Sequence, residues 1–209
     1  MIEGLDSAAT IIIVFVSLVI SITIHEAMHA FTGHWLGDDT AKIEGRISLN
    51  PFRHIDLFTT ILLPLITLII FKVPLLAAKP VPFNPNKVKF EEFGAALVGI
   101  AGPLTNLLMA ILTSVIVNVF GSSLAVGIQQ ALLIYMIVNV GLFVFNMIPI
   151  PPLDGSRLLY SVAPESVKAF MGSLEQLGIV IIFAIVLMVP AFGELIVDLN
   201  LKIINFLLF

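Results

Sequence analysis

Long apolar runs separated by short polar segments dominate the hydrophobic pattern of this chain. The apolar runs cover residues 8–36, 57–78, 93–120, 124–148 and 174–190. A run of about 20 apolar residues is long enough to cross the hydrocarbon core of a bilayer as a helix. In lipid, a helix satisfies all of its backbone polar groups within its own segment. The pattern therefore predicts an all-α polytopic membrane protein, a helical bundle of about five to six spans.

Two polar segments predict other structure. Residues 41–49 alternate polar and apolar positions, which predicts short membrane-associated β segments. Residues 194–209 alternate apolar positions with charged and amide side chains, which favours a helix lying along the membrane interface. No repeat and no soluble domain is apparent, so we expect a single transmembrane domain over residues 1–209.

The composition supports a lipid-facing surface. Of the 209 residues, 59% are hydrophobic and 11% are charged, whereas a soluble domain has about 25% charged residues. The net charge of −4 shows no basic excess, so we expect no nucleic-acid partner. The chain has no cysteine, which excludes disulfides and thiolate sites. The acidic N-terminus is unlike a signal peptide, and we expect the first run to remain as a permanent span.

His25-Glu26-Ala27-Met28-His29 lies in the last part of the first apolar run. Residues four apart share one face of a helix, so both imidazoles can reach one Zn²⁺ ion. Glu26 is then placed to take a proton from water at the metal. Such a motif also occurs by chance in soluble helices. In a membrane helix, however, each buried ionisable side chain costs about 2–4 kcal/mol, which favours the metal site.

Catalytic zinc usually has three protein ligands, so the motif needs a third. His34 is near in sequence, but its spacing of nine residues from His25 places it on the opposite helix face. His54, in a polar segment, is a candidate for an outer contact. Asp154 is the better candidate ligand, because it ends the proline-rich segment 146–155, where a regular helix is prevented. The alternative for Asp154 is an ordinary Asp-Gly turn.

Two asparagines are candidates for catalytic support. Asn106 lies near the start of the third apolar run, and Asn146 lies near the end of the fourth. A buried amide needs hydrogen-bond partners, and each could bind a substrate backbone or the oxyanion formed on attack. Gly99 and Gly102 precede Asn106 and are explained by close helix packing.

The depth of these residues predicts the topology. His25 is about 26 Å along the first span, so the site lies near the end of that span. The third span should start, and the fourth should end, on the same side. Residues 57–78 should then form a re-entrant hairpin and not a single crossing. This arrangement collects nearly all Lys and Arg residues on the site side, which the positive-inside rule identifies as the cytoplasm.

Three motifs in order carry a family resemblance. HEAMH (25–29), GPLTN (102–106) and NMIPIPPLDG (146–155) together resemble the site-2 protease family of intramembrane zinc metalloproteases, over about residues 8–190. The segments 36–38, 45–51 and 79–82 are similar to its compact prokaryotic branch. The better-known members contain an inserted soluble sensor domain, which this chain lacks. The residues whose roles the resemblance implies are the zinc ligands His25, His29 and Asp154, the catalytic base Glu26, and the supporting residues Asn106 and Asn146.

The resemblance implies one Zn²⁺ per chain and an intramembrane zinc metalloendopeptidase that acts in regulated intramembrane proteolysis. Its substrates are expected to be transmembrane or membrane-adjacent segments of membrane proteins. The expected location is a prokaryotic cell membrane, with the lipid bilayer and substrate helices as partners. The alternatives are a divalent metal transporter or channel, whose path buried His and Asp residues would line, and a non-proteolytic metal-binding member.

Overall fold

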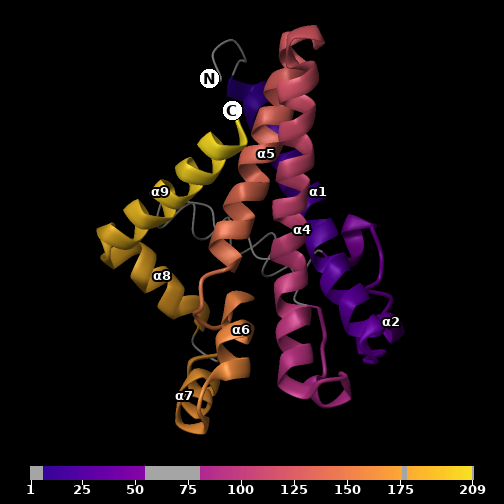
Figure 1. Cartoon of the computed structure of the whole chain (residues 1–209), viewed down its shortest axis with the longest axis vertical. Coiled ribbons are helices and arrows are strands. Elements are labelled where there is room, and N and C mark those ends of the chain that lie inside the picture. The colour runs from indigo at the N-terminus through magenta and orange to yellow at the C-terminus, as the bar shows by residue number, and fades with distance from the viewer. Residues whose placement is uncertain (1–6, 55–80, 176–177, 209) are drawn as a thin grey trace.

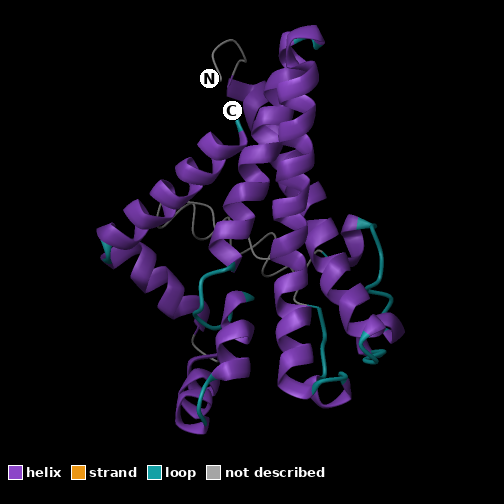
Figure 2. Ribbon diagram, viewed as in Figure 1, coloured by secondary structure: helices purple, strands orange, loops and turns teal. Residues whose placement is uncertain are grey.

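The computed structural model describes residues 7–54, 81–175 and 178–208, and every regular element in these residues is a helix (Figures 1 and 2). The α-helices are α1 (Ser7–Trp35), α2 (Thr40–Ile43), α4 (Glu91–Phe120), α5 (Val126–Asn146), α6 (Gly155–Val162), α7 (Glu165–Glu175), α8 (Gly178–Met188) and α9 (Pro190–Leu207). The short 3-10 helices are η1 (Pro51–Arg53), η3 (Pro85–Lys87) and η4 (Gly121–Ser123).

Three of these helices are long and apolar enough to cross a membrane. They comprise α1 over Ala8–Trp35, α4 with η4 over Glu91–Ser123, and α5 over Val126–Asn146. Each of the three packs against the other two. Their bounds follow the apolar runs of the sequence, which confirms a helical membrane protein.

The three long helices alternate in direction. Lys89, just before α4, donates its backbone N–H to the carbonyl of Leu36, just after α1, at 2.8 Å. Asp154, beyond the end of α5, reaches His25 and His29 in the last part of α1. The end of α1, the start of α4 and the end of α5 therefore lie together, at what we call the site end of the bundle (Figure 1). These directions agree with those predicted from the sequence.

A buried carboxylate ties the segment after α1 to the segment before α4. α1 ends at Trp35, and Gly37, two residues later, has a φ of +111°, a conformation that favours glycine. Asp38 follows, is 2% exposed, and accepts backbone N–H groups of Asn84 at 2.7 Å and Thr40 at 3.0 Å. Burial alone would raise the pKa of Asp38, but these hydrogen bonds outweigh burial and hold the pKa below its usual range.

The segments on both sides of the predicted hairpin lie at the site end. η3 is held there through Asp38, and η1 contacts α1 there. The predicted re-entrant hairpin over 57–78 itself lies outside the described residues, so it stays a prediction.

The prediction of β segments at 41–49 is wrong. Residues 40–43 form the single turn α2, and the remainder is turns and bends. The Asp38 carboxylate accepts the N–H and hydroxyl of Thr40, which starts this turn locally. The backbone N–H of Arg46 then bonds back to the carbonyl of Ala41 at 2.8 Å. These backbone groups are engaged within the turn, and no described segment pairs with them as a strand.

A fifth span at 174–190 is not confirmed by the described residues of this run, which contain the helix α8 and are not among the three candidate spans. α8 has 11 residues, about 16 Å, which is short of a hydrocarbon core of about 30 Å. Pro190 begins a new helix, α9, because its ring fixes a helical φ while it cannot donate to the helix before it. α8 and α9 form a V beside the bundle, with α9 returning to pack on α5 (Figure 1). Residues 194–208, predicted to lie along the membrane interface, therefore pack against α5 of the bundle.

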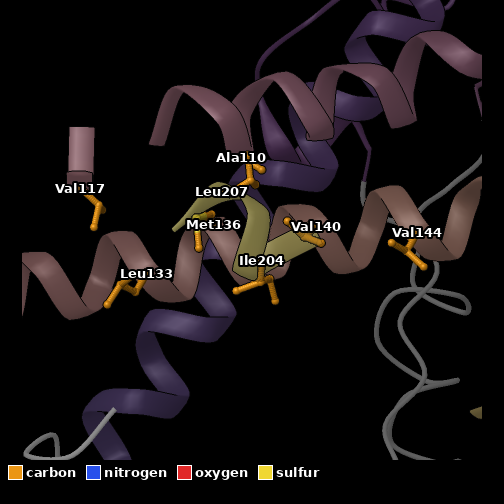
Figure 3. Close-up of a cluster of buried hydrophobic side chains, with 8 residues drawn as sticks. All are labelled: Ala110, Val117, Leu133, Met136, Val140, Val144, Ile204 and Leu207. Atoms are coloured by element: carbon orange, nitrogen blue, oxygen red, sulfur yellow. The ribbon is translucent and has the colours of Figure 1, made fainter. Parts of the chain in front are cut away.

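Buried apolar side chains hold the bundle together away from the site end. They come from α4, α5 and α9, with Met136 and Val140 fully buried at the centre (Figure 3). The end of α9 is fixed by the Leu207 carbonyl, which accepts hydrogen bonds from Ser114 and Asn118 of α4. The apolar core and the polar residues of the metal site therefore occupy different ends of the bundle.

Candidate metal centre

Two histidines of α1 form one side of the site. His25 and His29 are buried, and their Nε2 atoms lie 3.0 Å apart. The spacing of four residues puts both rings on one helix face. The rings are nearly perpendicular, at 83°, and their Nε2 atoms converge on one point.

The third donor is Asp154, the residue directly before α6. Its Oδ2 lies 3.1 Å from His25 Nε2 and 3.3 Å from His29 Nε2. Zinc bonds of about 2.0–2.2 Å place tetrahedral donors about 3.3–3.5 Å apart, which is close to these separations. Two imidazoles and one carboxylate are also a donor set that catalytic zinc uses, with the fourth position taken by water or substrate. The three residues therefore fit a zinc ion.

A sharp reversal of the chain after α5 returns Asp154 to α1. The Leu153 N–H bonds to the Ile150 carbonyl at 2.9 Å within this reversal. A Cβ on Gly155 would lie 2.3 Å from the carbonyl oxygen of Met147, so only glycine fits there. The sequence left two alternatives for Asp154, a metal ligand or an ordinary Asp-Gly turn. In the structure the Asp-Gly pair forms a tight turn, and the same Asp154 is placed as a metal donor.

Two glycines of α4 allow the ligands to meet. A Cβ on Gly102 would lie 2.4 Å from His29 Nε2 and 2.7 Å from His25 Nε2. A Cβ on Gly99 would lie 3.1 Å from the Asp154 carbonyl oxygen. Close helix packing explains both glycines, as the sequence predicts. Gly102 also forms a wall of the metal site. The sequence could not indicate this second role, because His25 and His29 are far from Gly102 along the chain.

Each histidine is oriented by a contact from α4. His25 Nδ1 lies 2.6 Å from Asn106 Oδ1, and His29 Nδ1 lies 2.7 Å from the carbonyl oxygen of Val98. Such outer contacts fix the ring orientation and the tautomer of metal-binding histidines. The Val98 contact could not be predicted from the sequence, because any residue supplies a backbone carbonyl.

Comparison with known proteins supports this geometry. The model of Peptidase family M50 matches residues 114–189, which include Asp154. YwhC of Bacillus subtilis, named as a candidate zinc metalloprotease, is 36% identical over 182 residues, which are 84% of this chain and 80% of YwhC. The chain belongs to peptidase family M50.

More distant relatives extend over most of this M50 chain. Rip2 of Mycolicibacterium smegmatis and Rip2 of Mycobacterium tuberculosis, also named as candidate zinc metalloproteases, are 25% and 24% identical. Their alignments cover 92% and 89% of this chain and 73% and 71% of the relatives. No solved structure matches the chain significantly. The family confirms the predicted site-2 protease resemblance, and this M50 protein is a zinc metalloprotease with membrane-spanning helices.

Glu26 lies beside the ligands of this M50 site. It is 9% exposed and follows His25 directly on α1. Its carboxylate makes no hydrogen bond or ion pair with any residue that the structure describes, so its oxygens can accept protons from water or substrate. Among the described residues this buried carboxylate has no partner, and an unpaired buried carboxylate is costly in a purely structural role. This environment is compatible with the proton-transfer role predicted for Glu26.

Asn106, predicted as a supporting residue, contacts the ligand His25 and the neighbouring helices. It is 1% exposed, and its Nδ2 donates to Asn139 Oδ1 at 2.9 Å and to the Ser21 carbonyl at 3.4 Å. With its oxygen on His25, both polar atoms of the amide are engaged by the protein. These contacts are suited to orienting the His25 ring.

Three other predicted candidates lie outside the ligand cluster. Asn146 donates to the Leu142 carbonyl at 3.0 Å, one turn back on α5. His34 pairs with Asp39 at 2.6 Å near the surface, as its opposite helix face predicts. His54 is buried and lies 2.7 Å from the Ser48 carbonyl, so it stabilises its own loop.

Proposed function

We propose that this metalloprotease is an intramembrane endopeptidase, cleaving transmembrane or membrane-adjacent segments of membrane proteins as in regulated intramembrane proteolysis. One observation carries the proposal: two of the three clustered donors, the buried His25 and His29, lie on α1, a helix long and apolar enough to span a bilayer, and the half-buried Asp154 meets them there. His29 precedes the end of α1 at Trp35 by six residues, about 9 Å. A peptide bond cut at this depth lies within the membrane or at its boundary.

The chemistry follows from the residues around the metal. When bound, zinc supplies a Lewis acid that lowers the pKa of a water molecule and polarises a carbonyl. Glu26 accepts the proton of the attacking water and returns it to the leaving amine. Asn146 donates one Nδ2 hydrogen to the Leu142 carbonyl, so its second Nδ2 hydrogen remains available, and the family resemblance implies that this hydrogen supports the developing oxyanion. Asn106 keeps His25 in place throughout.

The substrate helix must unwind, because an intact helix shields its peptide bonds with its own hydrogen bonds. We expect a single-span test substrate with a Gly-Gly pair at the site depth to be cut up to roughly 30-fold faster than one with Ala-Ala, since each glycine weakens a helix by about 1 kcal/mol. The measurement is product mass and initial rate in proteoliposomes.

Controls separate this reading from the alternatives. A zinc chelator should stop the cleavage, and added zinc should restore it. Equal rates for the two substrates would contradict unwinding as a requirement. Zinc flux across the proteoliposome membrane without any cleavage would instead favour a transporter, and zinc binding without either activity would favour a non-proteolytic member.

We also propose that the site end faces the cytoplasm of a prokaryotic cell. The described cationic residues near the site end lie on or beside α2, η1, η3, α6 and α7, and they are Lys42, Arg46, Arg53, Lys87, Lys89, Arg157 and Lys168. Lys202 lies on α9, toward the opposite end. Lys and Arg are enriched in cytoplasmic loops of membrane proteins, which supports this orientation.

Cysteine labelling tests the orientation directly, because the chain has no native cysteine. Glu44→Cys and Asn86→Cys, both at exposed positions, are expected to react with a membrane-impermeant reagent from the cytoplasmic side only. Ser122→Cys, in the η4 turn, is expected to react only from outside. Labelling of positions 44 and 86 from opposite sides would defeat the topology.

A further inference from the structure

A chain of buried amides leads from the metal ligand His25 to two backbone carbonyls. His25 Nδ1 contacts Asn106 Oδ1, and Asn106 Nδ2 donates to Asn139 Oδ1. Asn139 Nδ2 in turn donates to the Tyr135 carbonyl and to Ser21 Oγ, each at 2.9 Å. Asn139 and Ser21 are both fully buried, at 0% exposure, between α5 and α1. Neither touches the metal cluster itself.

The direction of every hydrogen bond in this chain is fixed by the Tyr135 carbonyl. A carbonyl oxygen only accepts, so the Asn139 atom that faces it must be the NH₂ group. The Asn139 oxygen then faces Asn106, which must present its own NH₂ group. This leaves the Asn106 oxygen facing His25, so His25 Nδ1 carries the proton. The Nε2 lone pair of His25 is thereby directed at the metal position.

His29 reaches the same state by a shorter route. Its Nδ1 faces the Val98 carbonyl directly, and a carbonyl again requires an N–H donor. The two ligands therefore present the same nitrogen to the metal. One is fixed by a backbone group and the other by two side-chain amides. A backbone carbonyl cannot rotate away, whereas an amide side chain can turn over if its partners are lost.

We propose that Asn139, with Ser21 behind it, is a positioning residue that keeps the Asn106 amide from turning over and so holds His25 in its zinc-binding tautomer. Without the Asn139 oxygen, the Asn106 NH₂ group retains only the 3.4 Å contact with the Ser21 carbonyl. A reversed Asn106 presents NH₂ to His25, which favours the tautomer whose proton is on Nε2. That tautomer cannot bind the metal. The proposal rests on the zinc site and is independent of where substrates are cut.

The test is Asn139→Leu, which has similar volume and no polar atom. We expect about tenfold weaker zinc affinity, measured by chelator competition, since losing an outer partner of a ligand costs about 10–100-fold. In the zinc-loaded protein, the Nδ1–H signal of His25 in ¹H–¹⁵N NMR should move upfield and exchange faster with water. The His29 signal should stay unchanged, because its partner is the Val98 carbonyl. The chain has only four histidines, which makes the signals assignable.

Two variants serve as controls. Asn139→Asp, whose buried acid must be protonated to donate to the Tyr135 carbonyl, keeps an oxygen toward Asn106 and is expected to stay within about threefold of the parent affinity, below the cost of a lost outer partner. Gln130→Leu removes another buried amide of α5, nine residues away, and is expected to have no effect on His25. If Asn139→Leu does not fold, Asn139→Ala provides the same comparison. The proposal would be overturned if Asn139→Leu left the zinc affinity and the His25 signal unchanged, or if the His29 signal changed as much as the His25 signal. These measurements do not depend on whether the protein cleaves membrane substrates.

Discussion

Replacing Glu26 by Gln is expected to lower the cleavage rate by about 10²–10⁴-fold, the usual contribution of a general base. Gln has nearly the same volume but cannot accept a proton from water. Because His25, His29 and Asp154 remain, zinc content should stay near one ion per chain. The measurements are initial cleavage rate in proteoliposomes and metal analysis of the same preparation.

A matched carboxylate variant shows whether the effect belongs to the site. Glu194→Gln changes an exposed glutamate on α9 and should leave the rate unchanged. Near-normal cleavage by Glu26→Gln would remove Glu26 from the mechanism. Loss of zinc together with activity would show that Glu26 serves in binding the metal, which also contradicts its assignment as the base.

The second large effect is expected for Gly102→Ala. The added methyl group would lie 2.4 Å from His29 Nε2 and 2.7 Å from His25 Nε2, so the rings must move. Both Nδ1 atoms are held on α4 by Asn106 and Val98, so neither ring can move without losing an outer contact. We expect zinc affinity to fall by at least about 100-fold, the upper end of the cost of losing an outer partner.

Metal analysis after dialysis against a weak chelator measures this effect. Gly127→Ala, on α5, is the matched control, because a Cβ there meets nothing within 4 Å. It should retain both zinc and cleavage. Retention of full zinc by Gly102→Ala would mean that α4 lies farther from the histidines than the structure places it.

The sequence predicted the parts of the site that depend on local spacing. The i, i+4 rule places His25 and His29 on one face, and the prolines before Asp154 prevent a regular helix, which made Asp154 a candidate ligand. The long apolar runs likewise predicted α1, α4 and α5, because their lengths match a bilayer. Each of these inferences uses residues close together in the chain.

What the sequence could not supply depends on contacts between distant segments. Asn106 carries the same amide whether it faces a substrate or His25, and only the position of Asn139 decides between them. Gly102 resembles any helix-packing glycine until the histidines are placed against it. At 41–49, the alternation that suggests strands is overridden by the Asp38 carboxylate, which starts a turn through Thr40.

The shared dependence of both histidines on α4 has a thermodynamic consequence. Metal binding requires α1, α4 and the Asp154 turn in their native arrangement, so the binding free energy adds to the stability of the folded chain. A ligand at 1,000 times its dissociation constant contributes about 4 kcal/mol by mass action. Under zinc starvation, the protein should therefore become more susceptible to unfolding and degradation. Its abundance, and not only its activity, would then follow the supply of the metal.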